Sequence, residues 1–137
     1  MRRLSNTLSI FTFATCLAGS AAIAEETVTA EQLKALITGN TLYVDLPAGA
    51  PGAPDGGSAP IYYAADGSAA ALLPSGLQLV GRWALEADRY CIDWDNGPKN
   101  SCTQLIRAEQ GFVVIDANIG EPRGVATRIA AGNPEDL

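Results

Sequence analysis

The sequence of 137 residues contains no histidine. Without an imidazole, the chain has no Ser-His-Asp or Cys-His catalytic arrangement, no histidine acid–base catalyst, and few of the ligands that catalytic zinc sites use. Carboxylate pairs, which serve glycoside hydrolysis, remain available, and Asp93 and Asp95 form the closest such pair. These residues flank an expected turn, where Asp is favoured for its local hydrogen bonds. We therefore expect a protein that is not an enzyme and that uses no metal or cofactor.

Positive charge is also scarce, because nine Lys and Arg residues stand against fifteen Asp and Glu residues. This balance argues against binding to nucleic acid or to anionic membrane surfaces, since both attract clustered Lys and Arg. Long hydrophobic runs are lacking too. The apolar stretch 8–17 is too short for a membrane span, which needs about 20 apolar residues. We expect no nucleic-acid partner and no membrane span in the mature chain.

The first 24 residues have the pattern of a cleavable signal peptide. Arg2 and Arg3 precede the apolar stretch 8–17, and small residues follow as far as Ala22-Ile23-Ala24, an A-x-A cleavage site. This order predicts cleavage near Ala24 and export to the periplasm or the medium. Residues 25–137 are then a single domain. Loss of the two arginines gives the mature chain a net charge of −8.

Cysteine is rare, and the three cysteines divide between the two parts of the chain. Cys16 lies in the signal peptide, where Phe13-Ala14-Thr15 before it is a poor lipobox, and whether it is ever lipidated stays open. The mature chain keeps Cys91 and Cys102. In an oxidising compartment such a pair is expected to form a disulfide. The spacing is not C-x-x-C and no histidine completes a zinc site, so a redox or metal pair is disfavoured.

Hairpin geometry gives the disulfide an expected register. If Cys91 faces Cys102, a four-residue loop, 95–98, closes on Trp94 and Lys99 and places the cysteines at a non-hydrogen-bonded pair. The cystine would then close a ring of about twelve residues and contribute about 3 kcal/mol in the chain-entropy model.

The remaining patterns predict a mainly β domain with one short N-terminal helix. Thr29-Ala30-Glu31-Gln32 has the form of a capping box and leads into apolar residues at helical spacing until Gly39-Asn40. The segment 77–85 alternates between apolar and polar positions, which is typical of a strand. Further strands are expected at 41–46, 60–65, 68–73, 89–94, 101–107, 112–118 and 124–130. The Pro- and Gly-rich segment 47–58 is expected to be an exposed, mobile loop.

Eight short strands with tight turns every eight to twelve residues predict an antiparallel meander. Such a meander forms a small barrel or a sandwich, and the sequence leaves the choice open.

Four aromatic residues, Tyr62, Tyr63, Trp83 and Trp94, are candidates for binding a ligand or a partner, because small barrels can enclose one ligand. Alternation places Trp83 on the same face as the leucines of 77–85, which favours a core position. Tyr62 and Tyr63 point to opposite faces, so only one of them can lie inside.

Two functions of different kinds are compatible with these features. The first is a non-enzymatic binding or accessory protein of the bacterial periplasm, which presents a sheet face or the segment 47–58 to a periplasmic or envelope protein. The alternative is a carrier of a small ligand, with a cavity lined by Trp83 and by Tyr62 or Tyr63. The first predicts a solid core and an exposed apolar patch of several hundred Å². The second predicts an internal cavity of about 300 Å³ or more.

Three short motifs occur in order along the chain: Tyr63-x-x-Asp66-Gly67, Gly81-Arg82-Trp83, and Tyr90-Cys91-x-x-Trp94 followed by Cys102. As a set they resemble a group of uncharacterised small periplasmic domains of proteobacteria, similar to the DUF995 type. The resemblance covers about residues 41–118. It implies an exported β-rich domain with a cysteine pair, and it implies no activity.

Overall fold

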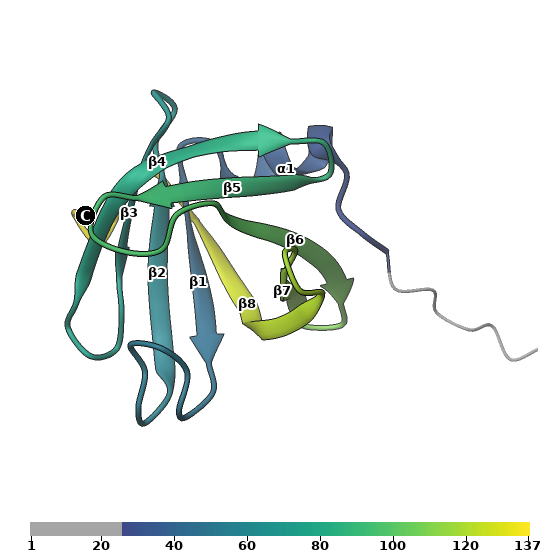
Figure 1. Ribbon diagram of the computed structural model, residues 1–137. Coiled ribbons are helices and arrows are strands. Elements are labelled where there is room, and N and C mark those ends of the chain that lie inside the picture. The colour runs from purple at the N-terminus through teal and green to yellow at the C-terminus, as the bar shows by residue number, and fades with distance from the viewer. Residues whose placement is uncertain (1–25) are drawn as a thin grey trace, which may run out of the picture.

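The computed structural model describes residues 26–137, which form a closed eight-stranded barrel preceded by one helix (Figure 1). Each strand pairs antiparallel with the next, and β8 pairs with β1 to close the barrel. Of the two expected forms of the meander, the barrel is the one observed. The expected signal peptide, its cleavage site and Cys16 lie outside the described residues. The elements are α1 (Ala30–Ile37), β1 (Asn40–Leu46), β2 (Gly57–Tyr63), β3 (Ser68–Leu72), β4 (Gln78–Glu86), β5 (Arg89–Trp94), β6 (Ser101–Ala108), β7 (Gly111–Asp116) and β8 (Glu121–Ala131).

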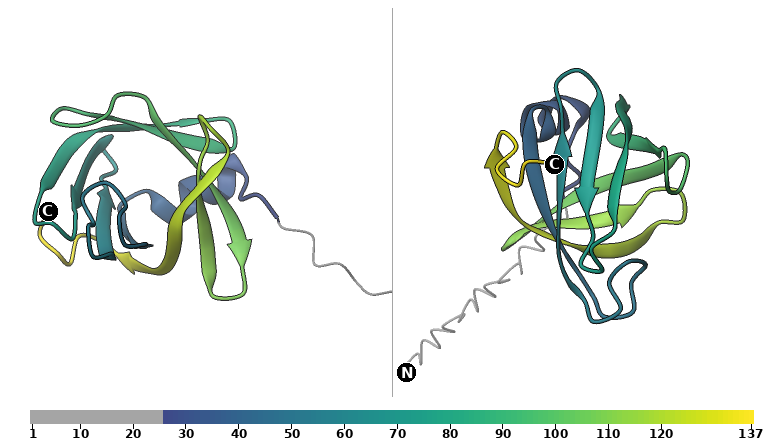
Figure 2. Two further views of the ribbon diagram at one scale, coloured as in Figure 1. Left: turned by 60° about the horizontal axis from the view of Figure 1, so that its bottom comes forward. Right: turned by 90° about the vertical axis from the view of Figure 1, so that its left-hand side faces the viewer.

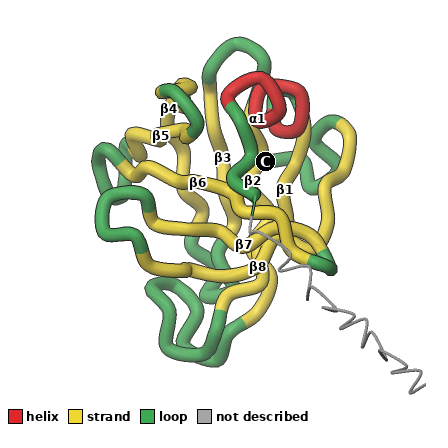
Figure 3. The backbone as a smooth tube through the Cα atoms, turned by 90° about the vertical axis from the view of Figure 1, so that its right-hand side faces the viewer, coloured by secondary structure: helices red, strands yellow, loops and turns green. Residues whose placement is uncertain are grey.

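The helix begins at the predicted capping box. The Thr29 hydroxyl accepts a hydrogen bond from the Gln32 backbone N–H, and the Gln32 side chain accepts one from the Thr29 backbone N–H, at 3.4 and 3.0 Å. Leu33 and Ile37 are fully buried, so α1 is held by the apolar face that it packs on the barrel. It contacts β1, β4 and β5 and lies at one end of the barrel (Figure 3).

The interior of the barrel follows from alternation along each strand. In β4, Leu79 and Gly81 are buried while Gln78, Val80 and Arg82 between and around them are exposed, as the period of two predicts. Gly81 has a specific packing role, because a Cβ atom at this position would lie 2.2 Å from the Asp93 carbonyl oxygen. The lack of a side chain therefore lets β4 and β5 approach closely.

The disulfide between Cys91 and Cys102 is present, in the expected register on neighbouring strands. The Cys102 carbonyl accepts a hydrogen bond from the Ala117 N–H, on the β7 side of the strand, at 2.9 Å. Because the N–H and C=O of a strand residue point to the same side, Cys102 exchanges no backbone hydrogen bonds with Cys91, which is the predicted kind of pair.

The predicted four-residue loop between these strands is wrong. The β5–β6 ladder has three residue pairs and ends at Ile92 and Ser101, so the connection runs over 95–100. Asn100 has a positive φ of 49°, and its N–H donates to the Asp93 carboxylate. This local bond to a side chain takes the place of the expected continuation of the ladder.

The segment 47–58 is not simply an exposed loop. Its last two residues belong to β2, and the rest forms consecutive turns in which Ala53 is fully buried. The Ala53 N–H donates to the Ala50 carbonyl, and the Ser75 N–H of the β3–β4 connection donates to the Gly52 carbonyl, both at 2.9 Å. The glycines and prolines thus form a folded connection that is tied to its neighbour.

Within residues 26–137, no helix is both long and apolar enough to cross a membrane.

Candidate functional site: a cavity inside the barrel

The barrel encloses a cavity of about 680 Å³ in the half that lies away from α1. Four connections surround its opening: 47–56, 73–77, 95–100 and 117–120. In an up-and-down barrel these alternate connections share one end, which the left panel of Figure 2 turns toward the viewer. The half next to α1 is instead filled by buried side chains, among them Leu33, Ile37, Leu42 and Leu105. The barrel is therefore open at one end and filled by packed side chains at the end next to α1.

The wall of the cavity on strands β1 to β4 is mainly apolar. Its inward side chains include Val44, Ala59, Ile61, Ala71 and Leu79. Small alanines on β2 and β3 leave space that larger residues would fill, and this is the reason why this half of the barrel is not closed by its own side chains.

Two tyrosines lie at the base of the cavity. Tyr63 on β2 and Tyr90 on β5 are almost completely buried, and the Tyr63 hydroxyl donates a hydrogen bond of 2.9 Å to the Tyr90 hydroxyl. Their rings meet edge to face with centroids 5.2 Å apart. Burial raises the pKa of both hydroxyls. At Tyr90, hydrogen bonds with Tyr63 and Thr103 lower the pKa, but the effect of burial is larger. Both tyrosines are therefore neutral at physiological pH and offer polar hydroxyls without charge.

A charged cluster lies closer to the opening. The Arg123 guanidinium on β8 binds the Asp116 carboxylate on β7 through Nε and Nη2, and its Nη1 donates to the Ser101 hydroxyl on β6 at 3.1 Å. Burial would raise the pKa of the Asp116 carboxyl, but hydrogen bonds from Arg123 and from the Asn118 backbone N–H outweigh it, and the pKa lies below its ordinary value. The ion pair is therefore formed at neutral pH.

The structure brings two of the four predicted aromatic residues to the cavity. Tyr63 and Trp94 line it. Trp83 lies on the inner side of β4 but beneath the cavity, where its ring packs on Tyr63 with centroids 5.7 Å apart and its Nε1 donates to the Ala64 carbonyl. Tyr62 faces the outside of the barrel, beside a shallow surface depression. An inward Tyr63 excludes an inward Tyr62, as alternation requires.

The polar residues of the cavity are not among the site residues predicted from the sequence. Thr103 and Ser101 lie opposite Tyr90 and Ile92, in the same register that pairs the cysteines. That register and the alternation of β5 were enough to place these hydroxyls inside. Asp116 lies opposite Thr103 in the unshifted β6–β7 ladder and therefore shares its face. Arg123 had no such signal, because β8 carries register shifts against both neighbours.

The carboxylate pair considered for hydrolysis lies elsewhere. Asp93 and Asp95 are exposed and do not line the cavity. The Asp93 carboxylate accepts the Asn100 N–H at 2.6 Å, which is the local turn bonding that the sequence suggested.

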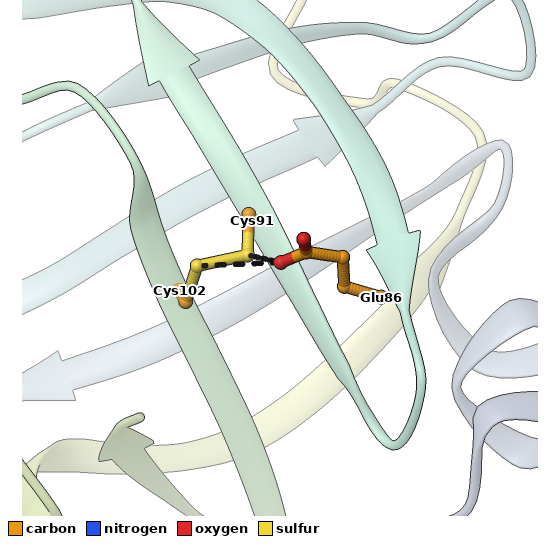
Figure 4. Close-up of side chains that lie close together, drawn as sticks. All are labelled: Glu86, Cys91 and Cys102. Atoms are coloured by element: carbon orange, nitrogen blue, oxygen red, sulfur yellow. Dashed lines mark hydrogen bonds between the residues drawn. A yellow bond between two sulfur atoms is a disulfide. The ribbon is translucent and has the colours of Figure 1, made fainter. Parts of the chain in front are cut away.

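One group of possible metal ligands occurs among the described residues, and it surrounds the disulfide (Figure 4). Glu86 Oε2 lies 2.9 Å from Cys91 Sγ and 4.0 Å from Cys102 Sγ. With the sulfurs bonded to each other, neither is a thiolate that binds a metal, and neither carries a proton to donate. The group is therefore a carboxylate beside a disulfide.

No protein-family model, curated protein or solved structure matches the chain. The resemblance to the DUF995 type stays a prediction from the motifs, and the function has to be inferred from the cavity.

Proposed function

We propose that this protein binds a small, mainly apolar molecule inside its barrel and acts as a carrier or sensor rather than as an enzyme. The observation that supports this is the cavity of about 680 Å³, open at one end and lined mainly by apolar side chains. Ligand sites in proteins have volumes of about 300–1,000 Å³ and combine apolar walls with a few polar groups.

The cavity favours this proposal over the protein-binding module. A module that only presents its outer surface needs a solid core, because empty interior volume costs stability. Here small residues such as Ala59 and Ala71 line the wall, and the protein's own side chains leave the cavity unfilled. A ligand bound in the cavity would make van der Waals contacts that the small alanine side chains cannot make with each other.

The proposed setting is the periplasm or the medium. The signal pattern of residues 1–24 predicts export, and the disulfide is compatible with an oxidising compartment. A carrier in such a compartment would hold apolar molecules that dissolve poorly in water.

The two tryptophans provide an internal test, because Trp94 lines the cavity and Trp83 does not. The neutral probe N-phenyl-1-naphthylamine is titrated into the Trp83→Phe and Trp94→Phe variants, and both tryptophan and probe fluorescence are recorded. We expect saturable binding of one probe per chain, with stronger quenching of Trp94 than of Trp83. Absence of saturable binding in both variants and in the unaltered protein would overturn the proposal.

A further inference from the structure

The polar groups of the cavity lie on one side of it. Thr103 and Ser101 on β6, Asp116 on β7 and Arg123 on β8 follow one another around the barrel, opposite the apolar wall of β1 to β4. A ligand that fills the cavity would therefore meet apolar surface on one side and hydrogen-bonding groups on the other.

The single cation of the lining is already engaged by the protein. Three of the five N–H groups of Arg123 are directed to Asp116 and Ser101. The lining also contains the carboxylate of Glu121, so that among the described residues the charged groups of the cavity are one guanidinium and two carboxylates. An anionic head group would have to compete with Asp116 for Arg123 and would face a net negative charge.

The other polar groups of the cavity are hydroxyls. Thr103 and Ser101 offer neutral donors and acceptors, whereas the hydroxyls of the almost fully buried Tyr63 and Tyr90 are bonded to each other at 2.9 Å. Such hydroxyls match alcohol, carbonyl or ether groups, whose burial costs much less than that of a charged group when a hydrogen bond replaces the lost water.

Building on the proposed function, we infer that the ligand is an uncharged amphiphile: an apolar body with an alcohol, carbonyl or ether group, and without a carboxylate, phosphate or ammonium group. Asp116 is then a specificity-determining residue, because its hold on Arg123 is what prevents the guanidinium from binding an anion.

Three probes of equal chain length test this inference: 1-decanol, decanoate and decylammonium. Each displaces N-phenyl-1-naphthylamine at pH 7.5. We expect decanol to bind at least ten-fold more tightly than decanoate or decylammonium. Tighter binding of either charged probe would overturn the inference and leave the proposed function standing, whereas failure of all three and of the naphthylamine would overturn the proposed function itself.

The Asp116→Asn variant tests the role of Asp116 directly. Release of Arg123 should raise the ratio of the decanoate affinity to the decanol affinity at least ten-fold. Asp45→Asn is the matched control, because Asp45 is exposed on the outside of β1 and the substitution removes the same charge. An equal ratio in the Asp116→Asn and Asp45→Asn variants would overturn the assignment.

Discussion

The Tyr63 hydroxyl donates a hydrogen bond to the Tyr90 hydroxyl across the base of the cavity, where the packed half of the barrel meets the open half. The bond joins β2 to β5. It therefore links two non-neighbouring strands at the base of the cavity.

The pair makes the two tyrosines energetically dependent on each other. Tyr90→Phe leaves the Tyr63 hydroxyl buried without its partner, which costs about 1–3 kcal/mol of unfolding free energy. In the double variant Tyr63→Phe/Tyr90→Phe no such hydroxyl is left, so we expect a loss smaller than the sum of the two single losses. Urea unfolding of the four proteins measures this coupling. Additive losses would show that the hydrogen bond contributes nothing.

The disulfide crosses one of the shortest strand pairings of the barrel. Cys91 and Cys102 are the middle pair of a ladder of only three residue pairs. We expect the Cys91→Ala/Cys102→Ala variant to lose about 3 kcal/mol of unfolding free energy, in line with a ring of this size. Urea unfolding provides the measurement. A loss below about 1 kcal/mol would show that the remaining ladders hold β5 and β6 together without it.

The carboxylate beside the disulfide should slow its reduction. Glu86 Oε2 lies 2.9 Å from Cys91 Sγ, where its negative charge, only partly offset by the exposed Arg89 guanidinium at 3.5 Å, repels an attacking thiolate. We expect Glu86→Gln to be reduced by dithiothreitol about two to five times faster, the effect of one partly exposed like charge. Glu109→Gln, at the exposed turn between β6 and β7, is the matched control. Equal reduction rates for the two variants would refute the effect.

The ion pair at the opening should make stability depend on acid pH. Asp116 has a folded pKa below its unfolded value of about 3.9, so folding favours its charged form. The resulting stabilisation is complete above the unfolded pKa and is lost as the pH falls through the folded pKa. The drop in Tm between pH 7 and pH 3 should therefore be smaller for Asp116→Asn than for Asp45→Asn. An equal drop in both variants would contradict the assigned role of Asp116.

Much of the fold could be predicted from the sequence because it depends on local rules. The capping box at Thr29 and the alternation of 77–85 each depend on neighbouring residues alone, and both are observed. The Cys91–Cys102 register could be predicted as well, since a hairpin leaves few alternatives. Closure of β8 on β1 is different, because it joins the two ends of the meander, and no local pattern distinguishes a barrel from a sandwich.

The cavity was harder to predict than the strands. It depends on which inward residues are too small to fill the barrel, such as Ala59 and Ala71, and this becomes visible only when all strands are placed. The sequence predicts that Trp83 lines either a ligand site or the core. In the structure it packs against the core and the Tyr63 ring, in the filled part of the barrel beneath the cavity. The Asp116–Arg123 pair depends on the shifted register of β8, which sequence alternation does not reveal.

The central claim is that the cavity binds a small apolar molecule. It is tested most directly by measuring how a neutral apolar probe binds to variants in which a larger side chain fills the cavity. The Ala71→Phe variant, and Ala59→Leu as a second variant in case the first does not fold, place a larger side chain on the cavity wall. Ala108→Phe, at an exposed position at the end of β6, is the control. With circular dichroism showing folded protein, we predict at least ten-fold weaker binding of N-phenyl-1-naphthylamine to the cavity variants and unchanged binding to Ala108→Phe. Unchanged affinity in a folded cavity variant would contradict the account.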